Sequence, residues 1–218
     1  CFQVRCRRPP ALNIFEKLLF LGLSVGELPR VRRTGACCVI SYDIGKSGQR
    51  LILADAVLGH FDRNRQRRPK SREAGGQLFA RFEGDTIRME QATGPRASDR
   101  RSSMTFIPDR LVERREIKRF FRLGLHYVGD WHTHPEHYPS PSQTDLNSVQ
   151  DMFRKSHHRL ASFVMIVVGT ETPPEGLFVA LCSATECHEL KLLEDPRPRA
   201  DEDPKEISFS NFKNLIPA

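Results

Sequence analysis

The chain has 218 residues, a formal net charge of +7 and 39% hydrophobic residues. This length and apolar content predict one globular domain and exclude a wholly disordered chain. The basic balance suits acidic partners in general. Nucleic acid is not an expected partner, because the arginines occur without interleaved aromatic residues that would stack on bases.

The chain contains six cysteines and no Cys-x-x-Cys pair. Small domains held together by disulfides carry their cysteines at higher density. The pattern is typical of a reducing compartment, so we expect a cytoplasmic protein. The six are Cys1, Cys6, Cys37, Cys38, Cys182 and Cys187.

Residues 1–48 show no sustained periodicity and are interrupted by prolines and glycines, which predicts a poorly ordered N-terminal extension. The apolar run 14–25 follows several arginines and loosely resembles a secretion signal. Glu16 and Lys17 interrupt it, and it is too short to span a bilayer. We expect a short amphipathic helix or unstructured chain there, and no membrane association.

The rest of the chain alternates between helical and strand patterns up to a loose tail at 193–218, rich in proline and charge. This alternation predicts a single α/β (α+β) domain over 49–192, with a mixed sheet flanked by helices. The predicted helices are 51–68, 109–123 and 142–158. The predicted strands are 78–82, 86–92, 125–134, 163–168 and 177–182, with an exposed loop at 94–103.

The residues with most chemical meaning are His132, His134 and Asp145. Side chains at i and i+2 of a strand share one face, so the two imidazoles converge. After a proline-rich loop, Ser142 can cap a helix that places Asp145 in its first turn, facing the histidines. Two histidines and one carboxylate, with a fourth position left to water, form the ligand set of a catalytic zinc.

Simpler explanations exist for each part of this pattern. A single His-x-His pair is commonly surface decoration, and Ser142 with Asp145 is also the signature of a capping box. The capping and metal-binding roles do not exclude each other. His137 is a decoy ligand in the proline loop, and two further histidines, at 157 and 158, complement the negative end of the helix.

The string Val-Gly-Asp-Trp-His-Thr-His-Pro-Glu at 128–136, followed by Pro-Ser-Pro-Ser-x-x-Asp at 139–145, resembles the JAMM motif of the JAB or MPN metallopeptidases. The resemblance covers about residues 50–192 and is strongest to the bacterial branch, which occurs beside ubiquitin-like conjugation enzymes in anti-phage operons. It implies a cytidine-deaminase-like fold and one Zn²⁺ per chain with a bound catalytic water.

The resemblance also assigns roles to two more residues. The family carries a glutamate on an earlier strand as general base, and Glu73, in the string Glu-x-Gly-Gly-x-Leu, matches it. Gly75 and Gly76 behind it permit close backbone approach. Ser142 corresponds to the serine that donates a hydrogen bond to the oxyanion, besides its possible capping role. The chain departs from the family at Ala80, where many relatives carry glycine.

Several other residues compete for roles at the site. Glu83 lies in a turn and Glu90 within a strand, and the acids at 113 and 116 are expected to be solvated partners of arginines. Trp131 is expected in the core. One interpretation of Asp130 is that it orients a ligand histidine from outside the coordination sphere, whereas strand alternation places it on the same face as His132 and His134.

These residues predict hydrolysis of a peptide or isopeptide bond without a covalent intermediate. The resemblance implies as partners a ubiquitin-like modifier or its conjugate, with E1- and E2-like conjugation enzymes. Two alternatives stay open: a JAB protein of DNA repair or sulfur-carrier processing, and a non-catalytic MPN interaction module. Bound zinc would separate the last from the rest.

Overall fold

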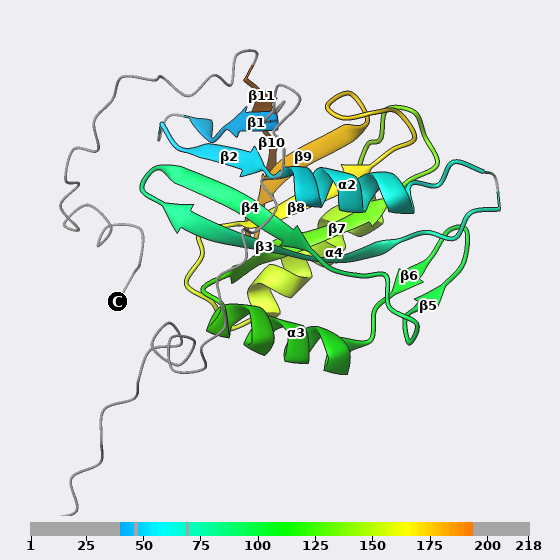
Figure 1. Cartoon of the computed structure of the whole chain (residues 1–218), viewed down its shortest axis with the longest axis horizontal. Helices are drawn as coiled ribbons and strands as arrows, with labels where there is room; N and C mark the ends of the chain where they lie inside the picture. The colour runs from blue at the N-terminus through cyan, green and yellow to red at the C-terminus, as the bar shows by residue number, and fades with distance from the viewer. Residues whose placement is uncertain (1–39, 46–47, 69, 194–218) are drawn as a thin grey trace, which may run out of the picture. The chain divides into compact units, whose positions relative to one another are not determined.

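The computed structural model describes residues 40–45, 48–68 and 70–193. These residues form a nine-stranded mixed sheet, a two-stranded hairpin and three helices (Figure 1). The expected single domain with a mixed sheet flanked by helices is confirmed. The predictions for the run 14–25 and for the tail from residue 194 lie outside the described residues.

The strands, in chain order, are β1 (Ile40–Asp43), β2 (Arg50–Leu53), β3 (Gly75–Glu83), β4 (Thr86–Ala92), β5 (Arg100–Arg101), β6 (Phe106–Ile107), β7 (His126–Thr133), β8 (Phe163–Val168), β9 (Leu177–Cys182), β10 (Cys187–Glu189) and β11 (Lys191–Leu192). The helices are α2 (Asp55–Asn64), α3 (Arg110–Arg122) and α4 (Gln143–Lys155).

The large sheet has the order β10-β9-β8-β7-β3-β4-β2-β1-β11. Its two outermost strands, β10 and β11, are separated in the chain by Leu190 alone. A sheet whose opposite edges are joined by one residue must curl strongly on itself. In its middle, β7 pairs antiparallel with β3 and parallel with β8, so the strand that carries the histidines is supported on both sides.

The helices cover both faces of the sheet (Figure 1). On one face, Phe61 of α2 packs with its ring centroid 5.1 Å from that of Trp131. On the other face, Val149 of α4 joins a buried cluster with residues of β8 and β9. On this face too, the ring centroid of Phe120 of α3 lies 4.5 Å from that of Phe79. No helix within the described ranges is long and apolar enough to cross a membrane.

The prediction of a single helix over 51–68 is wrong. Residues Arg50–Leu53 form β2, and only Asp55–Asn64 are helical. Short apolar runs do not distinguish a strand from a helix by period alone, and here β1 and β4 supply partners on both sides of β2. Strand β1 lies within residues 1–48, so the sheet starts before residue 49. The predicted loop 94–103 also contributes β5 to a hairpin.

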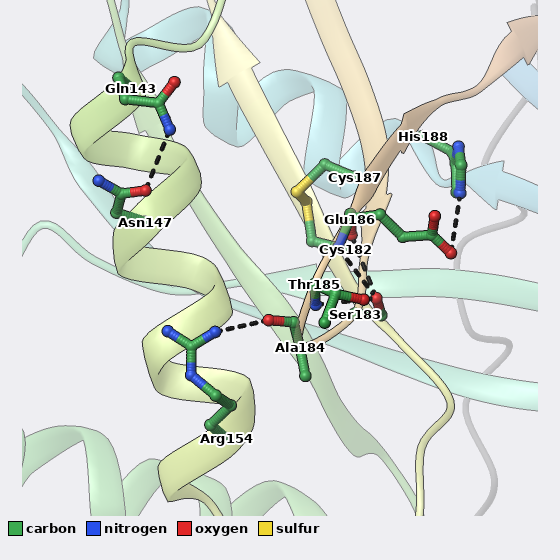
Figure 2. Close-up of a disulfide and its surroundings, with 10 residues drawn as sticks. All are labelled: Gln143, Asn147, Arg154, Cys182, Ser183, Ala184, Thr185, Glu186, Cys187 and His188. Atoms are coloured by element: carbon green, nitrogen blue, oxygen red, sulfur yellow. Dashed lines mark hydrogen bonds and ion pairs between the residues drawn. A yellow bond between two sulfur atoms is a disulfide. The ribbon is translucent and has the colours of Figure 1, made fainter.

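A disulfide joins Cys182 of β9 to Cys187 of β10, a pairing not expected for a chain assigned to a reducing compartment (Figure 2). Cys182 is fully buried beside Val149 of α4. Next to it, Arg154 near the end of α4 donates a hydrogen bond of 2.5 Å to the carbonyl of Ala184 in the β9–β10 turn. The C-terminal end of α4 is thereby attached to the sheet edge.

Candidate metal centre

Three potential metal ligands converge where β7 ends and α4 begins. His132 is on β7, His134 follows it, and Asp145 is in the first turn of α4. The two Nε2 atoms are 3.2 Å apart, and each lies 3.4 Å from an oxygen of Asp145. One ligand atom from each residue lies within 4.8 Å of the others. The predicted convergence is therefore present in the folded chain.

The start of α4 orients the carboxylate of Asp145. The Oγ atom of Ser142 accepts a hydrogen bond from the backbone N–H of Asp145, and the backbone N–H of Ser142 donates to Oδ2 of Asp145 at 2.7 Å. Oγ of Ser142 is also 2.7 Å from the same Oδ2. These contacts form the predicted capping box, which satisfies helix donors and fixes a side chain that faces the histidines.

Glu136, which sequence analysis did not single out, contacts the second histidine. Its Oε2 lies 3.2 Å from Nδ1 of His134. This approach is an ion-pair distance and not a hydrogen bond, since Nδ1 of His134 has no hydrogen-bond partner among the described residues. Together with the hydrogen bond to Asp145, the charge of Glu136 raises the pKa of His134. The sequence offered only one indication of this contact: Glu136 lies two positions after His134, close enough for its side chain to turn back toward the imidazole ring.

Electrostatics at the three residues fit a cation. Burial raises the pKa of Asp145, but hydrogen bonds from His132 and His134 outweigh it, so this pKa lies well below its usual range. The hydrogen bond to Asp145 raises the pKa of His134. The carboxylate thus stays ionised beside two imidazoles whose nitrogens point at one region. This donor set, two nitrogens and one oxygen, suits Zn²⁺ with a position left open.

Glu73 lines a cavity of about 200 Å³ together with His132 and Asp145. Its backbone is held by the hairpin, because its N–H donates to the carbonyl of Ser102 at 2.7 Å and its carbonyl accepts from Arg101 at 2.5 Å. Burial raises the pKa of Glu73. A half-buried carboxylate with a raised pKa beside candidate ligands can act as a general base.

The two glycines after Glu73 permit close contact, as predicted. A Cβ atom at Gly76 would lie 1.9 Å from the carbonyl oxygen of Thr93, and one at Gly75 would lie 2.6 Å from the ring of Phe106. Side chains at these positions would separate β3 from its neighbours. Gly75 also pairs directly with His132. The absence of a side chain at Gly75 therefore helps to set the distance between β3 and the histidines of β7.

The decoy histidines lie outside the cluster. His137 is exposed and contacts Glu171 at 2.9 Å. His158 packs against Phe153 and Phe163, just after the end of α4.

The competing acids at 83 and 90 form ion pairs with surface arginines, and the residue at 116 binds Arg96. Trp131 is 1% exposed, which confirms its place in the core.

Glu113 is a correction to the sequence analysis. It is not solvated: it is 3% exposed and accepts a hydrogen bond of 2.8 Å from Arg110. Asp130 lines the same cavity as His132, and its Oδ1 accepts a hydrogen bond from Tyr127 at 2.9 Å. Burial raises the pKa of Asp130 to about 7. The cavity wall is thus more acidic than the motif alone indicates.

Comparison with known proteins identifies similar chains. A family model described as prokaryotic homologs of the JAB domain matches residues 59–181. A protein of Enterobacter hormaechei subsp. hoffmannii named CD-NTase/cGAS isopeptidase is 31% identical over 108 residues, covering 49% of this chain and 59% of that protein. A Pseudomonas aeruginosa protein of the same name is 29% identical over 122 residues, covering 54% and 76%.

A Sinorhizobium fredii protein named probable metalloprotease y4qB is 38% identical over 72 residues, covering 31% of this chain and 44% of that protein. The matched part spans less than two thirds of the Enterobacter and Sinorhizobium relatives. Among solved structures, protein DSY2949 of Desulfitobacterium hafniense is 21% identical with a TM-score of 0.45, covering 63% of this chain and 87% of that one.

Proposed function

Because this chain belongs to the family of prokaryotic homologs of the JAB domain, we propose that it is a zinc-dependent metallopeptidase. Its proposed substrate is the peptide or isopeptide bond that follows the C-terminal tail of a ubiquitin-like modifier. The observation that carries this proposal is the convergence of His132, His134 and Asp145 beside a cavity that Glu73 lines together with His132 and Asp145. A hydrolytic metal site needs this combination of ligands and base.

The chemistry that zinc supplies when held by these three residues is polarisation of the scissile carbonyl and a lowered pKa of water, toward about 7. Glu73 takes the proton from the attacking water and returns it to the leaving nitrogen. Burial raises the pKa of Glu73, which favours its service first as proton acceptor and then as proton donor. No covalent bond to the protein is required at any step.

Ser142 is proposed to stabilise the developing oxyanion by donating a hydrogen bond from its hydroxyl group. In the structure this side chain is exposed and belongs to the capping box of Asp145. Its Oγ lies 2.7 Å from Oδ2 of Asp145, so the hydroxyl must rotate away from that oxygen to reach a substrate. While the hydroxyl hydrogen points elsewhere, Oγ of Ser142 can still accept the hydrogen bond from the backbone N–H of Asp145 and so still cap the helix.

The biological setting is proposed from the relatives. Two of them are named CD-NTase/cGAS isopeptidase. This name supports a role in bacterial anti-phage defence and a substrate in which a modifier is joined to a CD-NTase or cGAS-like enzyme. E1- and E2-like conjugation enzymes would then be functional partners. The complete set of ligands and base disfavours the alternative of a non-catalytic interaction module.

The test is cleavage of modifier fusions by the full chain. Purified protein is loaded with zinc and incubated with ubiquitin-like modifiers carrying a C-terminal reporter, either as linear fusions or through a lysine isopeptide. A sulfur-carrier protein in the panel tests the cofactor-synthesis alternative. Products are identified by mass spectrometry, and we expect one cut after the modifier tail.

A chelator should abolish this cleavage, and added zinc should restore it. Protein that binds zinc stoichiometrically and cuts no member of the panel would contradict the proposed activity. Cleavage that survives chelation would contradict the metal mechanism.

A further inference from the structure

The cavity at the metal centre continues into a groove between α3 and α4. The inner cavity has a volume of about 200 Å³ and the outer groove about 590 Å³. Arg110 and Glu113 of α3 and Ser148 and Met152 of α4 line both of them. An extended peptide that presents a bond to the metal centre therefore has a path over this face of the sheet.

The floor of this path is formed by alternate residues of β3 and β7. Gln77 lies four positions after Glu73, and Asp130 lies two positions before His132. Gln77 and Asp130 are direct partners in the β3–β7 pairing. The face is the one that α3 covers, because Phe79, two residues after Gln77, packs against Phe120 of that helix.

Gln77 is 3% exposed, yet its buried Oε1 has no hydrogen-bond partner. Leaving such an acceptor unpaired is costly, which points to a missing donor. Asp130 beside it accepts one hydrogen bond from Tyr127, and no ion pair in the described part of the chain involves it. Glu113, also 3% exposed, forms the adjacent wall.

These three side chains, Gln77, Asp130 and Glu113, are called here the acceptor notch. Its groups accept hydrogen bonds and two are acidic, so the matching ligand carries several N–H donors and a positive charge. Glu113 already contacts two arginines of the protein: Arg110, which donates to it at 2.8 Å from a side chain 61% exposed at the rim, and the buried Arg96, whose Nη1 lies 3.7 Å from it. Within the described residues neither arginine forms an ion pair with Asp130 or a hydrogen bond with Gln77, so these two side chains are the part of the site that is left for a ligand.

We propose that the acceptor notch is a specificity site that binds a basic side chain of the peptide substrate, with arginine preferred. The inference rests on the proposed peptidase function, because it assumes a peptide in the groove. A guanidinium group presents five N–H donors in one plane and can serve an amide oxygen and a carboxylate together. Lysine offers the charge, but its three N–H donors lie on one nitrogen and do not form a planar fork.

The position of this residue in the substrate follows from strand geometry. Asp130 is two residues from His132, about 7 Å along β7, and Gln77 is four residues from Glu73, about 13 Å if the extended backbone of β3 continues back to that residue. An extended peptide parallel to these strands advances by a similar amount per residue. The basic side chain should thus lie two to four residues from the scissile bond.

The experiment uses pairs of peptides that differ by arginine against citrulline, which has nearly the same shape and no charge. Each pair places this residue at one position within four of the scissile bond, on either side. For the zinc-loaded full chain, we expect kcat/KM to favour arginine by about 10–100-fold at one position. The gain should lie in KM, with kcat little changed.

Gln77→Leu and Asp130→Asn should each reduce this preference to within about threefold, by raising KM for the arginine peptide. The matched control is Asp151→Asn. This residue lines the outer groove, but its oxygens already contact Arg154 and Lys155, so the arginine preference should persist. Equal rates for arginine and citrulline at every position would overturn the notch as a specificity site.

Binding to the metal-free full chain separates this inference from the proposed function. Labelled arginine peptides should bind more tightly than their citrulline partners without being cut, as measured by fluorescence anisotropy. Selective binding without cleavage by the zinc form would keep the notch and overturn the peptidase. Cleavage without arginine selectivity in rate or binding would keep the peptidase and overturn the notch.

Discussion

Ser142 and Asp145 hold each other at the start of α4, and the same contact aims a candidate ligand at the histidines. Oδ2 of Asp145 accepts the backbone N–H of Ser142 at 2.7 Å, while Oδ1 faces Nε2 of His132 at 3.4 Å. A single carboxylate thus serves both the helix and the metal centre. Structural and chemical contributions of this pair must be separated by experiment.

Two substitutions of Ser142 achieve that separation. Ser142→Ala should lower the free energy of unfolding by about 1 kcal/mol through loss of the cap, whereas Ser142→Gly should cost only a few tenths. Both remove the hydroxyl. If Ser142 stabilises the oxyanion, kcat should fall by about 10²–10³-fold in both variants. Activity that follows stability, with the glycine variant nearly normal, would leave Ser142 as a cap alone.

Removal of the carboxylate ligand should release the metal. Loss of a partner outside the coordination sphere costs about 10–100-fold in affinity, and we expect Asp145→Ala to exceed this. Zinc measured by mass spectrometry should fall well below one ion per chain. His137→Ala is the matched control, since this exposed histidine lies apart from the cluster and its loss should leave zinc content unchanged. Stoichiometric zinc in Asp145→Ala would reject the ligand set.

Loss of the proposed base should separate chemistry from metal binding. Glu73→Ala should lower kcat by about 10²–10⁴-fold while zinc content stays at the wild-type value. Glu83→Ala, at the exposed far end of β3, the strand that begins two residues after Glu73, should retain full activity. A fully active Glu73→Ala variant would show that the base is another residue.

The buried Glu113 should make stability depend on pH. Burial raises its pKa, Arg110 and Arg96 oppose the shift, and Asp99 adds to it, while Asp130 of β7 faces the same region. An acid with a raised folded-state pKa binds its proton more tightly when folded, so stability falls as pH rises above the unfolded value of about 4.3.

Glu113→Gln removes this titration. Its melting temperature relative to wild type should therefore increase as pH is raised from about 4 through the folded-state pKa of Glu113. Parallel thermal melts across this range give the difference directly, and other groups that titrate in both proteins cancel. A difference that stays constant with pH would mean that the Arg110 pair fully compensates burial.

Several elements could be read from local pattern. The helix at 110–122 has Asp109 as its cap, and β3 and β4 lie where strands were predicted, although β3 is buried over six consecutive residues and does not alternate. The capping box followed from the spacing of Ser142 and Asp145. Prediction failed at β2, because its three apolar residues, Leu51–Leu53, have no period of their own and take the conformation of the strands on either side.

By itself, the sequence determined the two histidines, the capped carboxylate and their approximate convergence, since these residues lie within fourteen positions and local backbone geometry relates them. Only the tertiary structure decided that Glu73 faces them, that Glu113 is buried and that Gln77 lies unpaired beside Asp130. Those relationships depend on the pairing of β3 with β7 and on the packing of α3 over both. Sheet register and helix packing join residues distant in the chain, and no local spacing encodes them.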